Sequence, residues 1–199
     1  MKLFWQPQTR AVRLVWMLNE TGVPYEKVLI DIRDPSKPRD PEFALASPMG
    51  KVPALADGEA RLAESAAICV YLADQYPKAG LAPHIGEANR ASYLWWMFFT
   101  PGVIEPAMSE KFQNIPPNRL RSGWGDFDQM MATFETGLAR GPWILGDKFS
   151  AADVMLGSSA VFMKQFGLLP KSPSLEAYAE RCLARQAYKD ARAVDAAQT

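Results

Sequence analysis

The stretch of residues 49–65, MGKVPALADGEARLAES, limits the possible folds more than any other part of the chain. The dipeptide Asp57-Gly58 lies between two short apolar runs, a pattern that strongly favours a β-hairpin. Glu64 and Ser65 then stand where the apolar spacing of the following residues begins to fit a helix. We therefore predict two paired strands that lead directly into a helix, with a polar corner at the junction.

The residues on either side of this stretch predict a small mixed sheet covered by helices, which is an α/β arrangement. Gly22 is well placed to end the first helix, and Pro77 to end the last one. A polar segment with several prolines, residues 31–41, connects the second strand to a weak helix. The predicted elements are strands at residues 2–5, 25–30, 54–56 and 60–62 and helices at residues 11–20, 42–46 and 65–76.

The second half of the chain shows only helical spacing. Residues 78–87 form a linker rich in glycine, proline and alanine, so we predict a first domain at residues 1–77 and an all-α domain at residues 88–199. Ser150 and Asp153 form a capping box, to which we assign a structural role. The predicted helices lie at residues 88–112, kinked or divided by Pro101 and Pro106, and at residues 124–138, 150–166 and 174–186, the last firm helix.

Charge and residue counts exclude several classes of function. The 22 acidic and 22 basic residues balance, so nothing favours a nucleic acid or an anionic membrane as partner. His84 is the single histidine and lies in the linker, which argues against a hydrolase triad and a metal site of several histidines. Cys69 and Cys182 are expected to be buried thiols rather than a disulfide. Residues 1–5 show no signal peptide, so we expect a cytoplasmic protein.

Three segments carry a resemblance to a known family: SPMGKVPALADGEARLAESAAICVYLADQYP, WILGDKFSAADVMLG and SLEAYAERCLARQAY. In this order and spacing, the chain resembles the cytosolic glutathione transferase superfamily over nearly its whole length. Among subgroups it most resembles the bacterial serine/threonine-type enzymes. The resemblance implies a thioredoxin-like N-terminal domain with a mixed four-stranded sheet, followed by an all-α C-terminal domain. It also implies a homodimer that binds glutathione and an apolar electrophile, without a metal.

The resemblance assigns most of the first segment's polar groups to glutathione. In the family the bond between Val52 and Pro53 is cis, which turns the Val52 N–H and C=O toward the cysteinyl main chain of the tripeptide. Glu64 offers a negative charge to an ammonium group, and Ser65 at a helix N-terminus binds the γ-glutamyl carboxylate. On the residues alone, an edge-strand proline and an ordinary helix cap are the simpler interpretations.

Thr9 follows the first strand and is the expected thiol-activating residue, because the family places a Ser, Tyr or Cys there. A hydroxyl in this place donates a hydrogen bond to the glutathione sulfur and stabilises the thiolate. Threonine departs from the commoner serine, and two alternatives stay open: Thr9 only caps the next helix, or Gln8 or Arg10 acts instead. No cysteine lies near this loop, which argues against the cysteine-type members.

Two basic residues and an apolar set complete the expected site. Lys51 is next to the Val-Pro step, and related chains often carry a basic residue near Arg39, so both are candidates for the glycyl carboxylate. Solvated surface charges are an equally good interpretation. The expected electrophile pocket takes residues from the first strand and the kinked helix, although such stripes more often form core. These residues are Trp5, Trp96, Phe99, Val103, Met108 and Phe112.

The function that these residues favour is glutathione transfer, in which the activated thiol attacks a hydrophobic electrophile. A second interpretation keeps the same site for glutathione-dependent reduction of peroxides or disulfides. A third is a binding or regulatory module without transferase activity. The intact Val-Pro and Glu-Ser pairs argue against the third, because a site without chemical use has no need to keep them.

Overall fold

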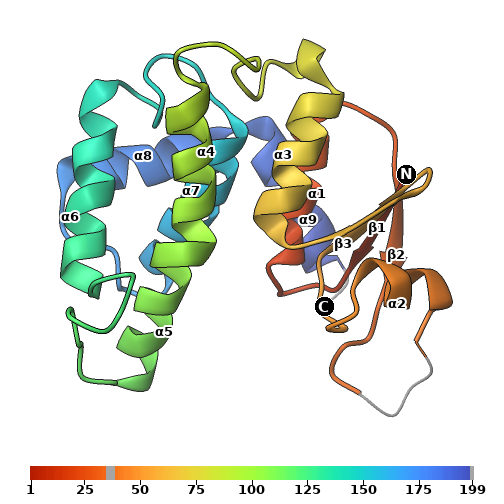
Figure 1. The fold of residues 1–199 in the computed structure, drawn as a ribbon, viewed down its shortest axis with the longest axis horizontal. Coiled ribbons are helices and arrows are strands. Elements are labelled where there is room, and N and C mark those ends of the chain that lie inside the picture. Colours follow the sequence, from red (N-terminus) through yellow and green to blue (C-terminus); the bar gives the residue numbers. More distant parts are fainter. Residues whose placement is uncertain (35–38, 198–199) are drawn as a thin grey trace. The chain divides into compact units, whose positions relative to one another are not determined.

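The computed structural model describes residues 1–34 and 39–197 of the 199-residue chain, which form two compact units (Figure 1). The first unit comprises Met1–Gly80 together with the segment from Ala184 onward, and the second comprises Leu81–Leu183. Part of the proline-bearing connection predicted at residues 31–41 lies outside the described residues.

The first unit is built on a four-stranded sheet with the strand order β2-β1-β3-β4. β1 is parallel to β2 and antiparallel to β3, and β3 is antiparallel to β4. The strands are β1 (Lys2–Trp5), β2 (Glu26–Leu29), β3 (Ala54–Asp57) and β4 (Ala60–Ala63). The mixed thioredoxin-like sheet predicted for this part of the chain is therefore confirmed.

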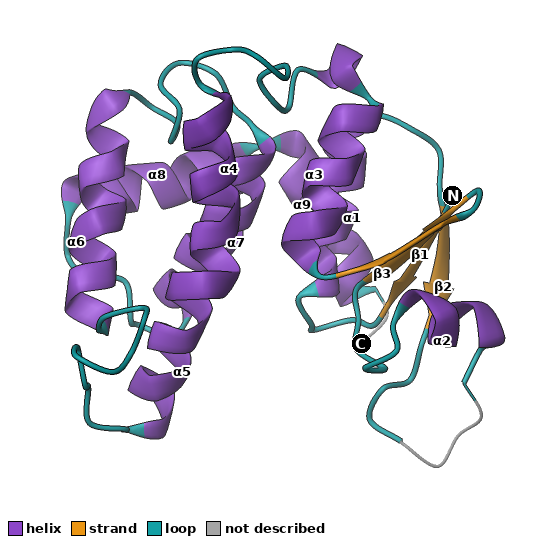
Figure 2. Ribbon diagram, in the orientation of Figure 1, coloured by secondary structure: helices purple, strands orange, loops and turns teal. Residues whose placement is uncertain are grey.

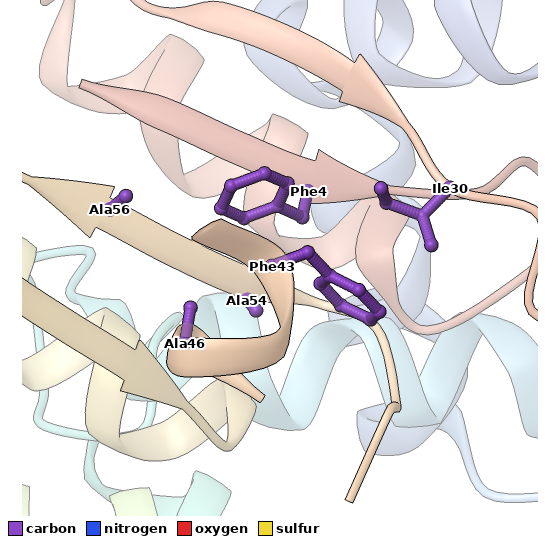
Figure 3. Close-up of a cluster of buried hydrophobic side chains, with 6 residues drawn as sticks. All are labelled: Phe4, Ile30, Phe43, Ala46, Ala54 and Ala56. Atoms are coloured by element: carbon purple, nitrogen blue, oxygen red, sulfur yellow. The ribbon is translucent and has the colours of Figure 1, made fainter. Parts of the chain in front are cut away.

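Helices cover both faces of this sheet (Figure 2). On the face covered by α2, Phe4 of β1 packs against Phe43 with their ring centroids 5.6 Å apart (Figure 3). Ala54 and Ala56 join the same cluster, because residues two apart on a strand share a face. The helices of this unit are α1 (Ala11–Thr21), α2 (Pro41–Ala46), α3 (Ser65–Gln75) and α9 (Gln186–Ala196).

Local signals end these elements much as the sequence predicts. Gly22 follows α1 in the left-handed conformation with φ 68°, where its N–H reaches the last carbonyls of the helix. The β3–β4 turn consists of Gly58 and Glu59, one residue later than the predicted Asp57-Gly58 turn. Asp57 is the last residue of β3, paired with Ala60, and its carboxylate accepts a hydrogen bond from a helix α3 tyrosine.

The C-terminal segment differs from the prediction. The sequence predicts a last helix at residues 174–186 within one domain from residue 88 onward, whereas α8 (Pro173–Ala184) is followed by α9 in the first unit. The Arg185 guanidinium donates to both carboxylate oxygens of Glu20 at 2.5 and 2.7 Å. Trp16 of α1 meets Tyr188 edge-on, with centroids 4.9 Å apart. These contacts tie α9 to α1.

The second unit is all-helical, as predicted. The described residues between α4 and α5 form a π-helical turn, Thr100–Ile104, so the prolines predicted to divide this helix lie in and just after the turn. Within residues 1–34 and 39–197, no helix combines the length and apolar character needed to cross a membrane. The helices are α4 (Arg90–Phe99), α5 (Glu105–Gln113), α6 (Phe127–Gly137), α7 (Ala151–Gln165) and α8.

Asp153 is the fully buried carboxylate that joins three segments of this unit. It completes the predicted capping box by accepting from the Ser150 N–H at 3.0 Å. It also accepts from the Ile144 N–H at 2.9 Å and from the Tyr178 hydroxyl at 3.0 Å. The assignment of a structural role to the capping box agrees with these bonds. Both cysteine thiols are buried and no disulfide joins them, and burial raises the pKa of Cys69 to about 12.

Asp153→Asn is expected to lower the free energy of unfolding by about 1–3 kcal/mol, because a single amide oxygen cannot serve every donor. Burial raises the pKa of Asp153 from 3.8 to about 6, so the folded chain holds this proton more tightly than the unfolded chain. Its contribution to stability is fully present below the unfolded pKa and is lost as the pH rises through the folded pKa. Urea unfolding at about pH 5 and about pH 7 should therefore show that the difference in free energy of unfolding between wild type and D153N is larger at the lower pH. An equal difference at both values would contradict this.

Candidate functional site

Three chain segments with polar groups leave the sheet of the first unit at one edge. Ala54, the first residue of β3, pairs with Phe4 near the end of β1 and with Ala63 at the end of β4. The loop after β1, the Val-Pro step before β3 and the residues after β4 therefore emerge side by side. Neighbouring strands are about 4.8 Å apart, so a small molecule can contact all three segments.

The peptide bond between Val52 and Pro53 is cis, as the resemblance implies. Pro53 is buried and Val52 is half-buried. Among the described residues, neither the N–H nor the C=O of Val52 has a hydrogen-bond partner. The main chain of Val52 therefore has one unused donor and one unused acceptor next to the first residue of β3.

Ser47 shapes the loop before Val52, although the sequence reasoning gave it no role. Its buried hydroxyl donates to the Lys51 carbonyl at 2.8 Å and accepts from the Lys51 N–H at 3.0 Å. Gly50 turns the chain with φ 64°, and its N–H donates to the Ser47 carbonyl at 2.8 Å. The only sequence signal for this role is the position of Ser47 directly before a proline in a predicted loop.

The Arg39 guanidinium lies against the backbone of Gly50, since an added Cβ there would be 1.4 Å from Arg39 Nη1. The structure thus brings Arg39 to the loop that carries Lys51. Both residues are exposed, and their assignment to a carboxylate stays a prediction.

The start of α3 is open to an anion. Glu64 precedes the helix with φ 67° and ψ 117°, a conformation that non-glycine residues rarely adopt and that is concentrated at functional sites. Ser65 is the first residue inside the helix, and no side chain caps this end. The first N–H groups of a helix have no acceptor within it. The simple cap expected as an alternative for Ser65 is therefore absent from this described segment.

The start of α1 is closed by its own residues. The Thr9 hydroxyl donates to the Gln6 carbonyl at 2.6 Å and accepts from the Ala11 N–H at 3.1 Å. The next two amides of α1 donate to the carbonyls of Thr9 and Arg10. These bonds correspond to the capping alternative for Thr9, and its activating role stays a prediction. Gln8, just before it, is exposed and has a positive φ of 57°.

The predicted electrophile residues are divided between the two units, and their role stays a prediction. Trp5 belongs to the first unit and the other five to the second. Trp96 and Phe99 are buried with centroids 5.1 Å apart, and Trp96 also faces Phe134 of α6. Phe112 is exposed and meets two phenylalanines of the α7 end, each at 6.0 Å. Val103 is half-buried in the π-helical turn and Met108 is buried in α5.

Comparison with known proteins decides the family. A model of the glutathione S-transferase N-terminal domain matches residues 9–75, and a model of the C-terminal domain matches residues 54–181. The chain belongs to the glutathione S-transferase family. Glutathione S-transferase 3 of Zea mays is 26% identical over 204 residues, which cover 95% of this chain and 91% of the relative.

Solved structures of the family resemble this member over nearly its whole length. A glutathione transferase from Methylococcus capsulatus strain Bath has a TM-score of 0.83 and 29% identity, and 98% of each chain is covered. A sphingomonad glutathione S-transferase, complexed with glutathione, has a TM-score of 0.80 and 28% identity over 98% of this chain and 99% of the other.

The described residues of this family member contain no cluster of acidic and thiol groups that suggests a metal site. No group of three or more His, Cys, Asp and Glu side chains in that part of the chain lies close enough to hold an ion. The polar groups at the sheet edge are instead main-chain amides and carbonyls, one carboxylate, two cations and two hydroxyls. Such a set suits a ligand that carries both charges and peptide groups.

Gly50→Ala is expected to destabilise the chain slightly more than Gly58→Ala, because the exposed Arg39 guanidinium has to move. Both positions have positive φ, 64° and 55°, and alanine there costs about 1–2 kcal/mol. A Cβ at Gly58 meets nothing within 4 Å, whereas at Gly50 it displaces the Arg39 guanidinium. Urea unfolding measures both costs, and in an Arg39→Ala background the cost of G50A should fall to that of G58A. An unchanged cost in that background would show that Arg39 does not occupy this space.

Proposed function

We propose that this family member is a glutathione transferase of the serine/threonine type, which binds glutathione at the sheet edge of the first unit. The observation that carries the proposal is the pairing of Ala54 with both Phe4 and Ala63, which brings three polar segments to one edge. Glutathione is a tripeptide with two carboxylates, one ammonium group and a thiol. The polar groups at this edge support an assignment of each of these features to one of them.

The main chain of Val52 serves the cysteinyl residue of glutathione. Its unused N–H and C=O pair with the cysteinyl C=O and N–H, as one added rung of a sheet. At the same edge, after β4, the α3 amides and the Ser65 hydroxyl bind the γ-glutamyl carboxylate with help from the helix dipole. Glu64 is exposed beside them and pairs with the ammonium group. Arg39 and Lys51 serve the glycyl carboxylate.

Thr9 stabilises the thiolate by turning its hydroxyl from the Gln6 carbonyl to the sulfur. A free thiol titrates near pH 8.5, and lowering its pKa by about two units takes roughly 2.7 kcal/mol. The exchange is favourable because a hydrogen bond to an anion is about twice as strong as one between neutral groups. The sulfur then attacks an electrophilic carbon, a carbon–sulfur bond forms, and a leaving group such as chloride departs with the bonding electrons.

Retention on immobilised glutathione and turnover of 1-chloro-2,4-dinitrobenzene test the function. We expect the wild type to bind the resin, to elute with free glutathione, and to convert this substrate faster than a hydroperoxide or a small mixed disulfide. Thr9→Ala should raise the pKa of the bound thiol by about one to two units and slow the reaction at neutral pH by about 10- to 100-fold. Thr9→Ser is the matched control and should keep both.

The possible outcomes separate the alternatives. Preferential turnover of the hydroperoxide or the disulfide would replace transfer by reduction at the same site. An unchanged thiol pKa in T9A, with a loss of about 1 kcal/mol in stability, would reduce Thr9 to the cap of α1. A protein that neither binds the resin nor converts any of the three substrates is not the proposed enzyme.

We further propose a homodimer, as the resemblance implies. α4 of the second unit exposes about half of Trp95 and Phe98, with 52% and 54% of their surface open. An open groove of about 780 Å³ runs beside Trp95 between α4 and α6. Large apolar side chains in such a position are typical of subunit contacts. Light scattering should give twice the 22.1 kDa chain mass, and Phe98→Glu should return the chain mass. A wild type of single-chain mass would contradict the dimer.

A further inference from the structure

Asp195, in the last turn of α9, is a buried charge that the proposed chemistry leaves unused. Only 2% of its surface is exposed. Its Oδ1 accepts a hydrogen bond from the Gln8 N–H at 2.8 Å, and its Oδ2 accepts from Arg192 Nη1 at 2.8 Å. A carboxylate is buried at low cost only when its oxygens are bonded in this way. One of its two bonds therefore reaches a residue 187 positions away in the sequence.

The bond to Gln8 holds the Pro7–Gln8 peptide unit, which precedes the backbone of Gln8 and then Thr9. Gln8 has φ 57°, a left-handed conformation that a glutamine adopts only where its surroundings hold it. Its side chain is exposed, so the backbone N–H is the part of Gln8 that is held. Fixing this peptide unit also fixes the direction in which the chain enters Thr9.

Two other hydrogen bonds among the described residues hold this loop, and both involve Gln6. The Gln6 side chain accepts from the Ile32 N–H at 2.9 Å, and the Gln6 carbonyl accepts from the Thr9 hydroxyl at 2.6 Å. The second of these bonds must open when Thr9 turns to the sulfur. Once it opens, the bond from Gln8 to Asp195 still holds the residue just before Thr9.

We propose that Asp195 is a positioning residue for thiol activation, acting through the Gln8 amide on the place of the Thr9 hydroxyl. This rests on the proposed function. Arg192 offsets the negative charge of Asp195, which would otherwise disfavour a thiolate nearby. The contribution of Asp195 is therefore one of geometry, and α9 becomes part of the site although it supplies no group to the ligand.

Asp195→Ala removes the acceptor for Gln8. With glutathione and 1-chloro-2,4-dinitrobenzene, we expect kcat to fall about tenfold, since a misplaced catalytic group costs rate rather than binding. KM for glutathione should change less than about twofold, because the binding groups lie on other segments. The thiolate absorbance of bound glutathione at fixed pH should fall together with kcat.

Two variants separate positioning from general support of α9. Arg185 lies at the start of α9, at the opposite end from Asp195, and forms an ion pair with Glu20 of α1. Arg185→Ala breaks this pair, so it should lower the thermal midpoint. It should leave kcat and thiolate absorbance unchanged. The double variant D195N/R192A removes the charge pair but keeps an amide oxygen for the Gln8 N–H. It should retain kcat near that of wild type. If D195A does not fold, Asp195→Leu removes the acceptor while filling the buried volume.

Each outcome bears on one claim. A wild type without glutathione turnover overturns the proposed function. An active wild type whose D195A and D195L variants keep kcat and thiolate absorbance overturns the positioning role. The positioning role is also overturned if kcat falls in R185A and D195A in proportion to the fall in each variant's thermal midpoint. The effect would then come from the packing of α9.

Discussion

The pairing of β3 with both of its neighbours is the interaction on which the candidate site depends. Each strand is only four residues long, so the register at Ala54 decides which residues lie just outside the sheet. A slip by one residue would turn the faces of β3 over, and Ala54 and Ala56 would leave the cluster around Phe43. The burial of Ala54 and Ala56 in this cluster thus favours the register that places the Val-Pro step at this edge.

The two helices that begin at this edge, α1 and α3, differ in how many of their first amides are free to bind a ligand. The first amides of α1 are taken by Thr9 and Arg10, so this helix offers its dipole but few donors. α3 keeps its first amides open after the strained residue Glu64. In the proposed function, a carboxylate binds at α3 through direct hydrogen bonds. A thiolate near α1 would need the Thr9 hydroxyl, which first has to leave its internal acceptor. The difference follows from which residue precedes each helix.

Much of this architecture could be predicted from the sequence, because local signals agree with one another. Gly22, the β3–β4 hairpin and the Ser150 capping box each combine a turn or cap residue with apolar spacing. The hairpin turn was misplaced by one residue because the pairing of Asp57 with Ala60 depends on the neighbouring strand as well as on turn propensity. α9 was missed because QAYKDARAVDA has few large apolar residues, and its place is set by distant partners such as Trp16.

The polar details of the site were beyond sequence reasoning for the same reason. A threonine after a strand predicts either a cap or a catalytic hydroxyl, and only the position of the Gln6 carbonyl shows where its proton lies. The roles of Ser47 and Asp195 depend on loop geometry and on a contact across nearly the whole chain. Such residues leave no pattern in a single sequence.

The first unit takes its residues from both ends of the described chain, with the whole of Leu81–Leu183 between them. A ribosome releases the sheet and α1 well before it releases α9. During that interval the Trp16 side of α1 lacks the cover of Tyr188, and the Gln8 amide lacks its acceptor. All of the all-helical unit, Leu81–Leu183, is released before α9, so this unit can fold while synthesis continues. The first unit is therefore begun before the all-helical unit but can be completed only after α9 has been made.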